Sequence, residues 1–298
     1  MSHHMKRESS LKRKVYSLAN MLIPDSVYTR LKFKRNLKRW PNLTNPQTFN
    51  EKLCWLKLHH RDSIMSVMVD KADAKKYVSA IIGDEYLIPT YGLWERIEDI
   101  DFDSLPRQFV MKGTHDSGRV IVCEDKKNLD IDIARKEMQL SLDRDFYAIT
   151  REWPYKNVPH RIIAEKFIQQ ADGGLTDYKF FCFNGHVDCV MVCLDRHLGD
   201  TKFYFFDRDW NFMRLNKRGL AAPEGFMLPR PEGLDKMFEI ASVLSHGQPF
   251  VRVDLYNVDG KIYFGELTFY PDGGVDPNIL PSTDERWGAL LNLNILNK

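Results

Sequence analysis

Long apolar runs, an export signal and an even set of cysteines are all missing from this chain of 298 residues. No stretch of eighteen apolar residues occurs, so we expect no membrane-spanning helix. The first residues lack the apolar core and cleavage site of a signal peptide. The five cysteines form an odd set, and we expect reduced thiols in a cytoplasmic protein rather than disulfides. Cys189 and Cys193 have no second Cys or His pair at zinc-like spacing, so we predict no zinc site.

The most familiar nucleotide and nucleophile fingerprints are also missing. The glycine-bearing loops match neither G-x-x-x-x-G-K-[ST] nor G-x-G-x-x-G, so a P-loop or a Rossmann site is not predicted. No Ser-His-Asp or Cys-His signature indicates covalent catalysis. No internal repeat, low-complexity tract or long Pro-rich or Gly/Ser-rich linker divides the chain. Its 43% hydrophobic and 28% charged residues are ordinary for a globular protein.

The charge is nearly balanced overall but uneven along the chain. Residues 1–40 hold eleven Lys or Arg and two acids, whereas the rest holds 32 basic and 39 acidic residues. The basic segment 11–40 also carries regularly spaced apolar residues. Such a segment can lie on an anionic membrane surface or hold a polyanionic substrate. It can equally be a solvated helical extension packed on the body. We predict no nucleic-acid binding, because the basic charge does not continue into the rest of the chain.

The hydrophobic pattern after residue 45 indicates a mixed α+β protein. Thr48 and Glu51 have the spacing of a capping box and open a helical pattern. The Asn184-Gly185 pair is a type I′ turn signal between two alternating runs. Further helices are expected at 66–82 (ended by Gly83), 129–142, 234–244 and 285–296. Strands are expected at 86–89 with 92–94, and at 109–112, 120–123, 161–168, 177–183, 187–194, 202–206, 250–256 and 261–269.

The first candidate site is a glycine-bearing loop that follows the strand 109–112. Lys112 ends that strand, and an ammonium there can reach nucleotide phosphates. The loop 113–118 is polar and small enough for its backbone N–H groups to approach phosphate oxygens. Read alone, the same pattern is also that of an ordinary hairpin turn.

The second candidate site lies on the hairpin 250–269. Alternation places Arg252 and Asp254 on one face of the first strand, and Glu266 and Thr268 on one face of the second. Two facing carboxylates repel unless a cation sits between them. Oxygen ligands with room for phosphates and water suit Mg²⁺, and Arg252 could neutralise phosphate charge. The alternative is a solvated face with scattered charges, which the apolar neighbours oppose.

The third candidate is the strand end Glu165-Lys166-Phe167-Ile168, followed by Asp172 and by Lys179. A strand edge with free backbone groups beside Phe167 could hold an adenine. Read alone, it is an amphipathic strand.

Taken in order, these features resemble the ATP-grasp superfamily, most closely its teichuronopeptide-biosynthesis (TupA-like) branch. The resemblance covers nearly the whole chain from about residue 45. It rests on these motifs: Thr48-Phe49-Asn50-Glu51-Lys52, Trp55-Leu56-Lys57-Leu58, Asp70-Lys71, Leu105-Pro106, Phe109-Val110-Met111-Lys112, His115-Asp116-Ser117-Gly118, Ile163-Ala164-Glu165-Lys166-Phe167, Asp177-Tyr178-Lys179-Phe180, Arg252-Val253-Asp254-Leu255-Tyr256 and Gly265-Glu266-Leu267-Thr268-Phe269-Tyr270-Pro271.

The resemblance implies an α+β ATP-grasp fold, with two antiparallel sheets that hold ATP after a smaller N-terminal α/β lobe. It also implies a division of the chain. Residues 1–44 would be a basic amphipathic extension and 45–104 the N-terminal lobe. Residues 105–170 would form the small subdomain with the phosphate loop, and 171–298 the C-terminal subdomain with the metal site.

The resemblance also implies roles for the site residues, with ATP and Mg²⁺ as cofactors. Lys112 would contact the α- and β-phosphates, and Arg252 would steady the γ-phosphate or an acyl phosphate. The superfamily usually has Asn two residues after its metal-binding Glu, and Thr268 stands there in this chain. The remaining roles would be the phosphate lid (Gly113, His115, Ser117, Gly118), the adenine hinge (Glu165, Lys166, Phe167, Ile168), other nucleotide contacts (Asp172, Lys179) and metal ligation (Asp254, Glu266, Thr268). His115 is also a candidate base.

The function implied by the resemblance is an ADP-forming carboxylate–amine ligase of capsular or teichuronic-type polysaccharide biosynthesis. ATP would convert a uronic acid carboxylate into an acyl phosphate, which an amino acid or amine displaces. The carboxylate would belong to a glycan or to a nucleotide- or lipid-linked sugar, and residues 6–39 could contact the inner membrane. The rival functions are phosphoryl transfer to a hydroxyl, glycan binding without turnover, and glycosyl transfer. The last rests on Asp-x-Asp at 101–103 and 207–209, in expected turns.

Overall fold

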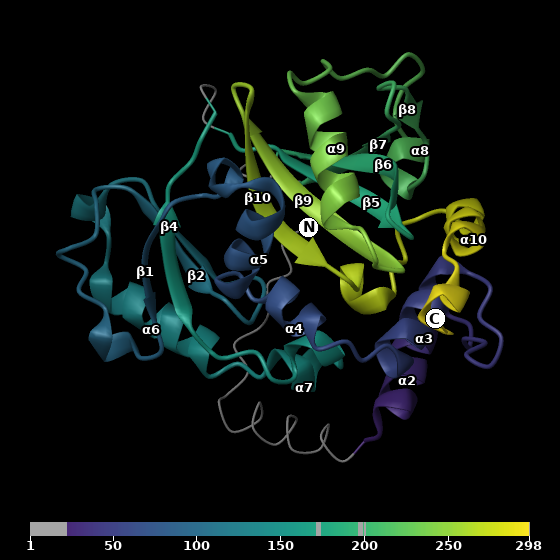
Figure 1. Cartoon of the computed structure of the whole chain (residues 1–298), viewed down its shortest axis with the longest axis horizontal. Helices are drawn as coiled ribbons and strands as arrows, with labels where there is room; N and C mark the ends of the chain where they lie inside the picture. Colours follow the sequence, from purple (N-terminus) through teal and green to yellow (C-terminus); the bar gives the residue numbers. More distant parts are fainter. Residues whose placement is uncertain (1–22, 171–173, 196–198, 200, 298) are drawn as a thin grey trace.

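Two antiparallel sheets form the centre of the protein (Figure 1). The computed structural model describes residues 23–170, 174–195, 199 and 201–297. One sheet has four strands in the order β1-β4-β2-β3, and the other has six in the order β10-β9-β5-β6-β7-β8. The expected α+β class with two antiparallel sheets is therefore confirmed.

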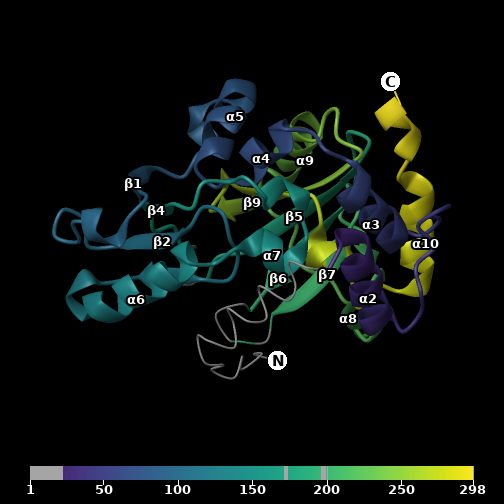
Figure 2. The ribbon, with the colours of Figure 1, turned by 90° about the horizontal axis from the view of Figure 1, so that it is seen from below.

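The four-stranded sheet is covered by a helix on one face. Its strands are β1 (Thr90–Trp94), β2 (Phe109–Gly113), β3 (Val120–Cys123) and β4 (Ile162–Lys166). Helix α6 (Ile131–Leu142) runs beneath it, as the view from below shows (Figure 2). Phe109, Met111 and Ile162 from the sheet pack against Ala134 and Met138 of α6. Because side chains alternate along a strand, Val110 and Lys112 of β2 lie on the opposite, uncovered face.

The six-stranded sheet holds most of the buried aromatic residues. Its strands are β5 (Asp177–Phe183), β6 (His186–Leu194), β7 (Lys202–Phe206), β8 (Phe212–Met213), β9 (Phe250–Val258) and β10 (Lys261–Thr268). Helix α9 (Leu234–Leu244) buries Met237, Phe238 and Ala241 against it, at the spacing of one helix face. The turn between β5 and β6 has positive φ at Asn184 (51°) and Gly185 (83°), as the predicted type I′ turn requires.

The remaining helices of the described residues lie around the two sheets (Figure 1). They are α2 (Asp25–Leu37), α3 (Phe49–His59), α4 (Ile64–Val69), α5 (Asp73–Ile82), α7 (Phe146–Thr150), α8 (Lys217–Leu220) and α10 (Pro281–Leu290). The Phe49 ring lies 5.0 Å from Phe250 and 5.3 Å from Trp287, which joins α3 to the sheet and to α10. Residues 45–104 contribute to both main cores, because α3 to α5 pack on the large one and Ile97 to Leu105 on the small one.

Three expected elements differ from the structure. The single helix expected at 66–82 is two helices, because Asp70 breaks it. Asp70 Oδ1 accepts hydrogen bonds from the backbone N–H of Ala72 (2.8 Å) and Asp73 (2.9 Å), which caps α5. Residues Asp84–Tyr86 form a 3₁₀ turn, and the strand begins only at Thr90. The last α-helix begins at Pro281 rather than at 285, since proline suits a first helical turn, and it ends at Leu290 before a 3₁₀ segment, Leu293–Asn297.

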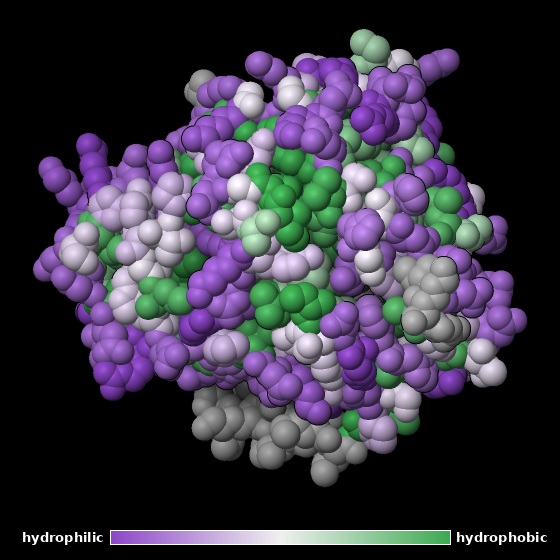
Figure 3. All heavy atoms as spheres, in the orientation of Figure 1, coloured by the Kyte–Doolittle hydropathy of each residue, from purple (hydrophilic) through white to green (hydrophobic). Residues whose placement is uncertain are grey.

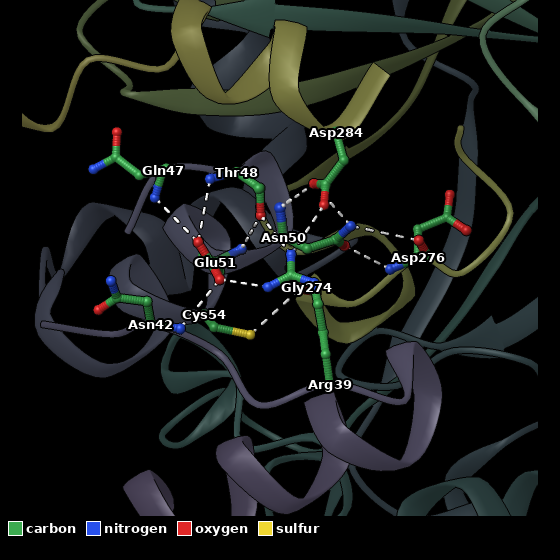
Figure 4. Close-up of polar contacts among 10 residues, drawn as sticks. All are labelled: Arg39, Asn42, Gln47, Thr48, Asn50, Glu51, Cys54, Gly274, Asp276 and Asp284. Carbon is green, nitrogen blue, oxygen red and sulfur yellow. Dashed lines mark hydrogen bonds and ion pairs between the residues drawn. The ribbon is translucent and has the colours of Figure 1, made fainter. Parts of the chain in front are cut away.

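The Thr48–Glu51 capping box forms as predicted and does more than begin α3 (Figure 4). The buried Glu51 carboxylate accepts from Arg39 at 2.6 Å and from the backbone N–H of Asn42 and Gln47 at 3.1 Å. Asn50 donates to Asp284 Oδ1 of α10 at 3.0 Å and accepts from the Asp276 N–H at 2.8 Å. Helix α3 is therefore bound to α10 and to the loop that follows β10.

The surface facing the viewer in Figure 3 is mostly hydrophilic, with apolar side chains gathered near its centre. Within the described residues, every helix is too short or too polar to cross a bilayer.

Candidate active site

The uncovered face of the small sheet combines charged and apolar side chains. Val110 lies opposite Glu165 of β4 and Val122 of β3, and Lys112 lies opposite Val120. Directly opposite residues of antiparallel strands share a face. Val120 and Val122 are 52% and 54% exposed, although both are apolar. This face therefore offers a hydrophobic surface next to a lysine and a carboxylate.

Glu165 on this face is buried between two lysines. Its carboxylate lies 2.6 Å from Lys112 Nζ and 2.5 Å from Lys75 Nζ of α5. Burial raises the pKa of Glu165, but Lys112 and Lys75 outweigh burial and the net shift is downward. Lys75 also donates to Ile88 O at 2.5 Å and to Thr90 Oγ1 at 2.9 Å. All three hydrogen-bond donors of Lys75 are thus in use. Lys112, in contrast, has Glu165 as its partner within the described residues and keeps further donors.

The large sheet contributes a second charged group on β5, β9 and β10. Lys179 lies opposite Asp254 in the strand register, and their side chains form an ion pair. Arg252 Nε and Nη2 donate to the two Asp254 oxygens, each at 2.7 Å. Asp254 lies opposite Glu266, as expected from the hairpin. Arg252 Nη2 also donates to Thr268 Oγ1 at 3.1 Å and lies 3.4 Å from Glu266 Oε1.

Basic side chains from both sheets affect the pKa of Glu266. Burial raises the pKa of Glu266, but Lys179, Lys71, Arg252 and Lys112 outweigh it and lower the pKa to about 2. Lys179 and Arg252 come from the large sheet, Lys112 comes from the small sheet, and Lys71 precedes α5. Basic side chains from both sheets therefore stabilise the charged form of one carboxylate.

Two basic side chains bind the backbone of the loop between β2 and β3. Lys71 Nζ donates to Asp116 O at 2.5 Å, and Arg144 donates to Ser117 O at 2.5 Å. Ser117 and Gly118 are exposed, and Gly118 has φ 99°, a conformation that favours glycine. A Cβ on the buried Gly113 would collide with Ser141 Oγ and come 2.5 Å from Asp116 Oδ1.

His115 is the loop residue that lies apart from this group. Its ring is 1% exposed and stacks on His160 with 3.9 Å between ring centroids. Nε2 lies 3.0 Å from Ser141 O. Burial and the neighbouring His160 lower the pKa of His115 to about 4, so the ring is neutral at pH 7. The structure thus places the imidazole in the packing beneath the loop.

The hinge between the sheets begins at the end of β4. Lys166 is exposed, Phe167 and Ile168 are half-buried, and the Lys166 N–H donates to Pro89 O at 2.9 Å. Asp172 lies outside the described residues. The two lysines engage the Glu165 carboxylate and Pro89 engages the Lys166 N–H, so this strand end offers its remaining backbone groups at 166–168.

A family model described as TupA-like ATPgrasp matches residues 51–292. The chain belongs to the TupA-like ATP-grasp family. The family and the fold expected from the sequence are confirmed. A comparison with curated proteins finds no match.

Several solved structures are similar to this ATP-grasp chain at low identity. D-alanine–D-alanine ligase from Bacillus anthracis, complexed with ATP, is 17% identical, with 78% of this chain and 66% of that chain covered and a TM-score of 0.46. The ATP-grasp ligase PsnB, complexed with a minimal precursor, Mg and ADP, is 11% identical over 74% and 57%, with a TM-score of 0.38. An L-amino acid ligase from Bacillus licheniformis is 12% identical over 73% and 47%, with a TM-score of 0.43. The chain thus spans about two thirds or less of the length of these proteins.

Two lysines that contact the expected site residues, Lys71 and Lys75, were not predicted from the sequence. Asp70-Lys71 was part of the family motif, but a lysine at a helix start is usually solvated. The tertiary structure brings Lys71 to the phosphate loop and Lys75 to Glu165.

The residues expected to hold magnesium have suitable oxygen donors but differ in availability. The Glu266 side chain is 41% exposed and Thr268 is half-buried, so both can ligate an ion. Asp254 is 3% exposed, and its two oxygens are bonded to Arg252 and Lys179. Among the described residues, no group of three or more His, Cys, Asp and Glu side chains could hold a metal alone. The donor set therefore fits an ion that takes its other ligands from phosphate and water.

Proposed function

We propose that this protein is an ATP- and Mg²⁺-dependent carboxylate–amine ligase that forms ADP. The observation that carries the proposal is the group of four basic side chains, Lys71, Lys112, Lys179 and Arg252, that act electrostatically on Glu266, with Arg252 Nη2 3.4 Å from its Oε1. A nucleoside triphosphate with its metal ion is the ligand whose charge suits such a group.

The nucleotide would lie between the two sheets. Lys112 has donors left for phosphate oxygens, because Glu165 is its partner in the described residues. The exposed Val120 and Val122 on the same face offer an apolar surface for the base and ribose. The backbone of the Lys166–Ile168 hinge would supply hydrogen bonds to the adenine edge.

Magnesium would be held by Glu266 and Thr268, and by Asp254 if that carboxylate exchanges one of its basic partners. When bound, the ion neutralises phosphate charge and orients the phosphates. Arg252 would stabilise charge on the transferred phosphoryl group. We assign no proton transfer to His115, because its ring is buried and neutral at pH 7. Its packing on His160 supports the phosphate loop instead.

The reaction joins a carboxylate to an amine in two steps. A carboxylate oxygen attacks the γ-phosphorus, which releases ADP and forms an acyl phosphate. The amine nitrogen then attacks the acyl carbon, the C–O bond to phosphate breaks, and phosphate leaves with the bonding electrons. The family resemblance suggests a uronic acid carboxylate of a surface polysaccharide or of its nucleotide- or lipid-linked precursor, and an amino acid or amine acceptor.

Contact with the inner face of a membrane is part of the same proposal. Phe33 of α2 is buried in a small core with Leu43 and Val275, while Val27 and Leu31 on the helix are 44% and 49% exposed. A helix packed on one side and apolar on part of the other can touch a lipid surface. Sedimentation with anionic and with neutral vesicles tests this. Equal, negligible binding to both would refute it.

The ligase proposal is tested by ADP release with glucuronic and galacturonic acid, free and nucleotide-linked, against a panel of amino acids. The expected product has the mass of an amide, and hydroxylamine in place of the amine should trap a hydroxamate. Asp254→Asn should abolish ADP release, whereas Asp235→Asn, which changes an exposed acid of α9 paired with Arg230, should leave it unchanged. A phosphorylated sugar without amide would indicate a kinase. Undiminished ADP release by Asp254→Asn would refute the site.

A further inference from the structure

A second group of charged side chains surrounds the loop that follows β10. Lys57 of α3 is fully buried and donates to Gly273 O at 2.8 Å. Lys32 of α2 reaches the other side of the same residue, where a Cβ on Gly273 would collide with its Nζ. That Cβ would lie 3.6 Å from Glu152 Oε1. Lys32, Lys57 and Glu152 thus meet at one glycine, which has φ 67°.

Glu152 is an unusual member of this group. It is 5% exposed, yet within the described residues no basic nitrogen comes within ion-pair distance of it. Its carboxylate has a hydrogen bond with the Thr150 side chain, Lys57 and Lys32 act on it without an ion pair, and Asp272 opposes them. A buried carboxylate is normally paired closely or replaced by an apolar residue, since burial without a partner is costly. A purely structural role does not account for it.

Two tyrosines connect Glu152 to the proposed reaction centre. Tyr270 is 2% exposed, its hydroxyl has no hydrogen-bond partner among the described residues, and Glu152 is the charged group with the largest effect on its pKa. The pKa of the buried Tyr155 is affected by Glu152 and also by Glu266 and Arg252. Tyr270 and Gly273 follow Thr268, the last residue of β10, so the group around Gly273 adjoins the strand that carries Glu266.

Lys32 has the character of a binding residue. It is half-buried, and it makes no hydrogen bond or ion pair with any residue that the structure describes. Burial and the neighbouring Lys57 lower its pKa by more than Glu152 and Asp272 raise it, so the ammonium is only partly compensated. Together, the Lys32 ammonium, the Glu152 carboxylate and the unpartnered Tyr270 hydroxyl match the groups of an α-amino acid.

We infer that Lys32, Glu152 and Tyr270 form the acceptor subsite, in which an amino acid places its carboxylate at Lys32 and its ammonium at Glu152. The inference rests on the proposed ligase function and names the acceptor class. Glu152 takes a proton from the ammonium, and the freed amine nitrogen attacks the acyl carbon as phosphate leaves. Lys57 positions the loop through Gly273 O and does not touch the substrate.

Calorimetric titration of the full chain, saturated with Mg²⁺ and a non-hydrolysable ATP analogue, against each standard amino acid tests the subsite. At least one should bind. Glu152→Gln and Lys32→Met should each weaken that binding by roughly tenfold or more, the loss of one charge-assisted contact. Affinity for the ATP analogue should stay within about twofold, since neither side chain is proposed to touch the nucleotide. Glu95→Gln and Lys34→Met, which change the same charges at exposed positions, should bind like the wild type.

The outcomes separate the two proposals. If the ATP analogue does not bind the wild-type chain, the proposed function fails and the subsite falls with it. If the analogue binds but no amino acid does, or if the two variants bind amino acids as the wild type does, the subsite is refuted. A parallel loss of nucleotide and amino-acid binding would mean that Glu152 is structural. With an active carboxylate, Glu152→Gln should keep hydroxamate formation, because hydroxylamine is neutral at pH 7, and should lose amide formation. Retention of both reactions would refute the proton transfer.

Discussion

Replacing Lys112 and Lys75 one at a time distinguishes nucleotide binding from structural support, because both lysines contact the same carboxylate. Lys112 Nζ and Lys75 Nζ lie 2.6 and 2.5 Å from Glu165. Lys75 also donates hydrogen bonds to Ile88 O and Thr90 Oγ1, whereas Lys112 keeps donors for a ligand. We therefore expect Lys112→Met to weaken nucleotide binding and Lys75→Met to weaken the fold.

The magnitudes follow from these contacts. Lys112→Met removes one charge-assisted hydrogen bond to phosphate. This should cost about 1.5–3 kcal/mol of binding free energy, which raises Kd by roughly 10- to 100-fold. That variant leaves Glu165 with Lys75 and should lower the free energy of unfolding by about 1–2 kcal/mol. Lys75→Met removes one of the two partners of the 4% exposed Glu165 carboxylate and the donor to two further acceptors, three charge-assisted contacts in all, so it should cost about 3–5 kcal/mol of unfolding free energy. Its effect on Kd should be under about tenfold.

Fluorescence titration with a labelled ATP analogue measures Kd, and urea denaturation measures stability. Lys136→Met removes the same charge from an exposed position of α6 and serves as the control. If Lys75→Met weakens nucleotide binding as much as Lys112→Met does, or if Lys112→Met binds like the wild type, the division of roles is incorrect.

Three further perturbations address neighbouring residues. Burial raises the pKa of Glu152 from 4.5 to about 7, so its stabilising contribution is complete below pH 4.5 and is lost as the pH rises through 7. Urea denaturation should therefore find Glu152→Gln more stable than the wild type by about 3 kcal/mol at pH 8 and equally stable at pH 4. Burial and His160 lower the pKa of His115 to about 4, so this residue takes up a proton in the unfolded chain before it does in the folded one as the pH falls below 6.5. Between pH 7 and pH 5 the wild type should lose about 2 kcal/mol more unfolding free energy than His115→Gln does. Equal losses in the two proteins would refute this. Gly273→Ala should abolish amino-acid binding, because its Cβ meets Lys32 at positive φ, while nucleotide titration remains near wild type.

The elements that could be predicted from the sequence are those fixed by local chemistry. The 234–244 helix has its apolar residues on one face, and the structure has the same bounds. Asn184-Gly185 sets the register of its hairpin, and the register of β9 and β10 brings Asp254 opposite Glu266. In these cases the interaction partners are close in the sequence, so periodicity and turn residues suffice.

The features that could not be predicted depend on contacts between distant segments. The helix break at Asp70 needs Thr114 and Arg161 as well as the local cap, because Asp70 Oδ2 accepts from Thr114 at 2.9 Å and Oδ1 lies 3.0 Å from Arg161. The Lys75–Glu165 pair spans ninety residues. The burial of His115 depends on its contacts with His160 and Ser141. No motif or period in the sequence specifies which of 43 basic side chains meets which acid.

Lys71 gives the clearest physical reason to regard the apo site as built for an anion. Burial is the largest influence on its pKa and lowers it; Glu266 acts in the opposite direction, and the net shift is downward. Its hydrogen-bond acceptor within the described chain is a carbonyl, Asp116 O, rather than a carboxylate. An ammonium in that setting is destabilised relative to water, which a fold selected for stability alone would remove. A phosphate placed under the loop would compensate Lys71 and Lys112 together. Binding energy would then come from charges that the fold itself leaves unsatisfied.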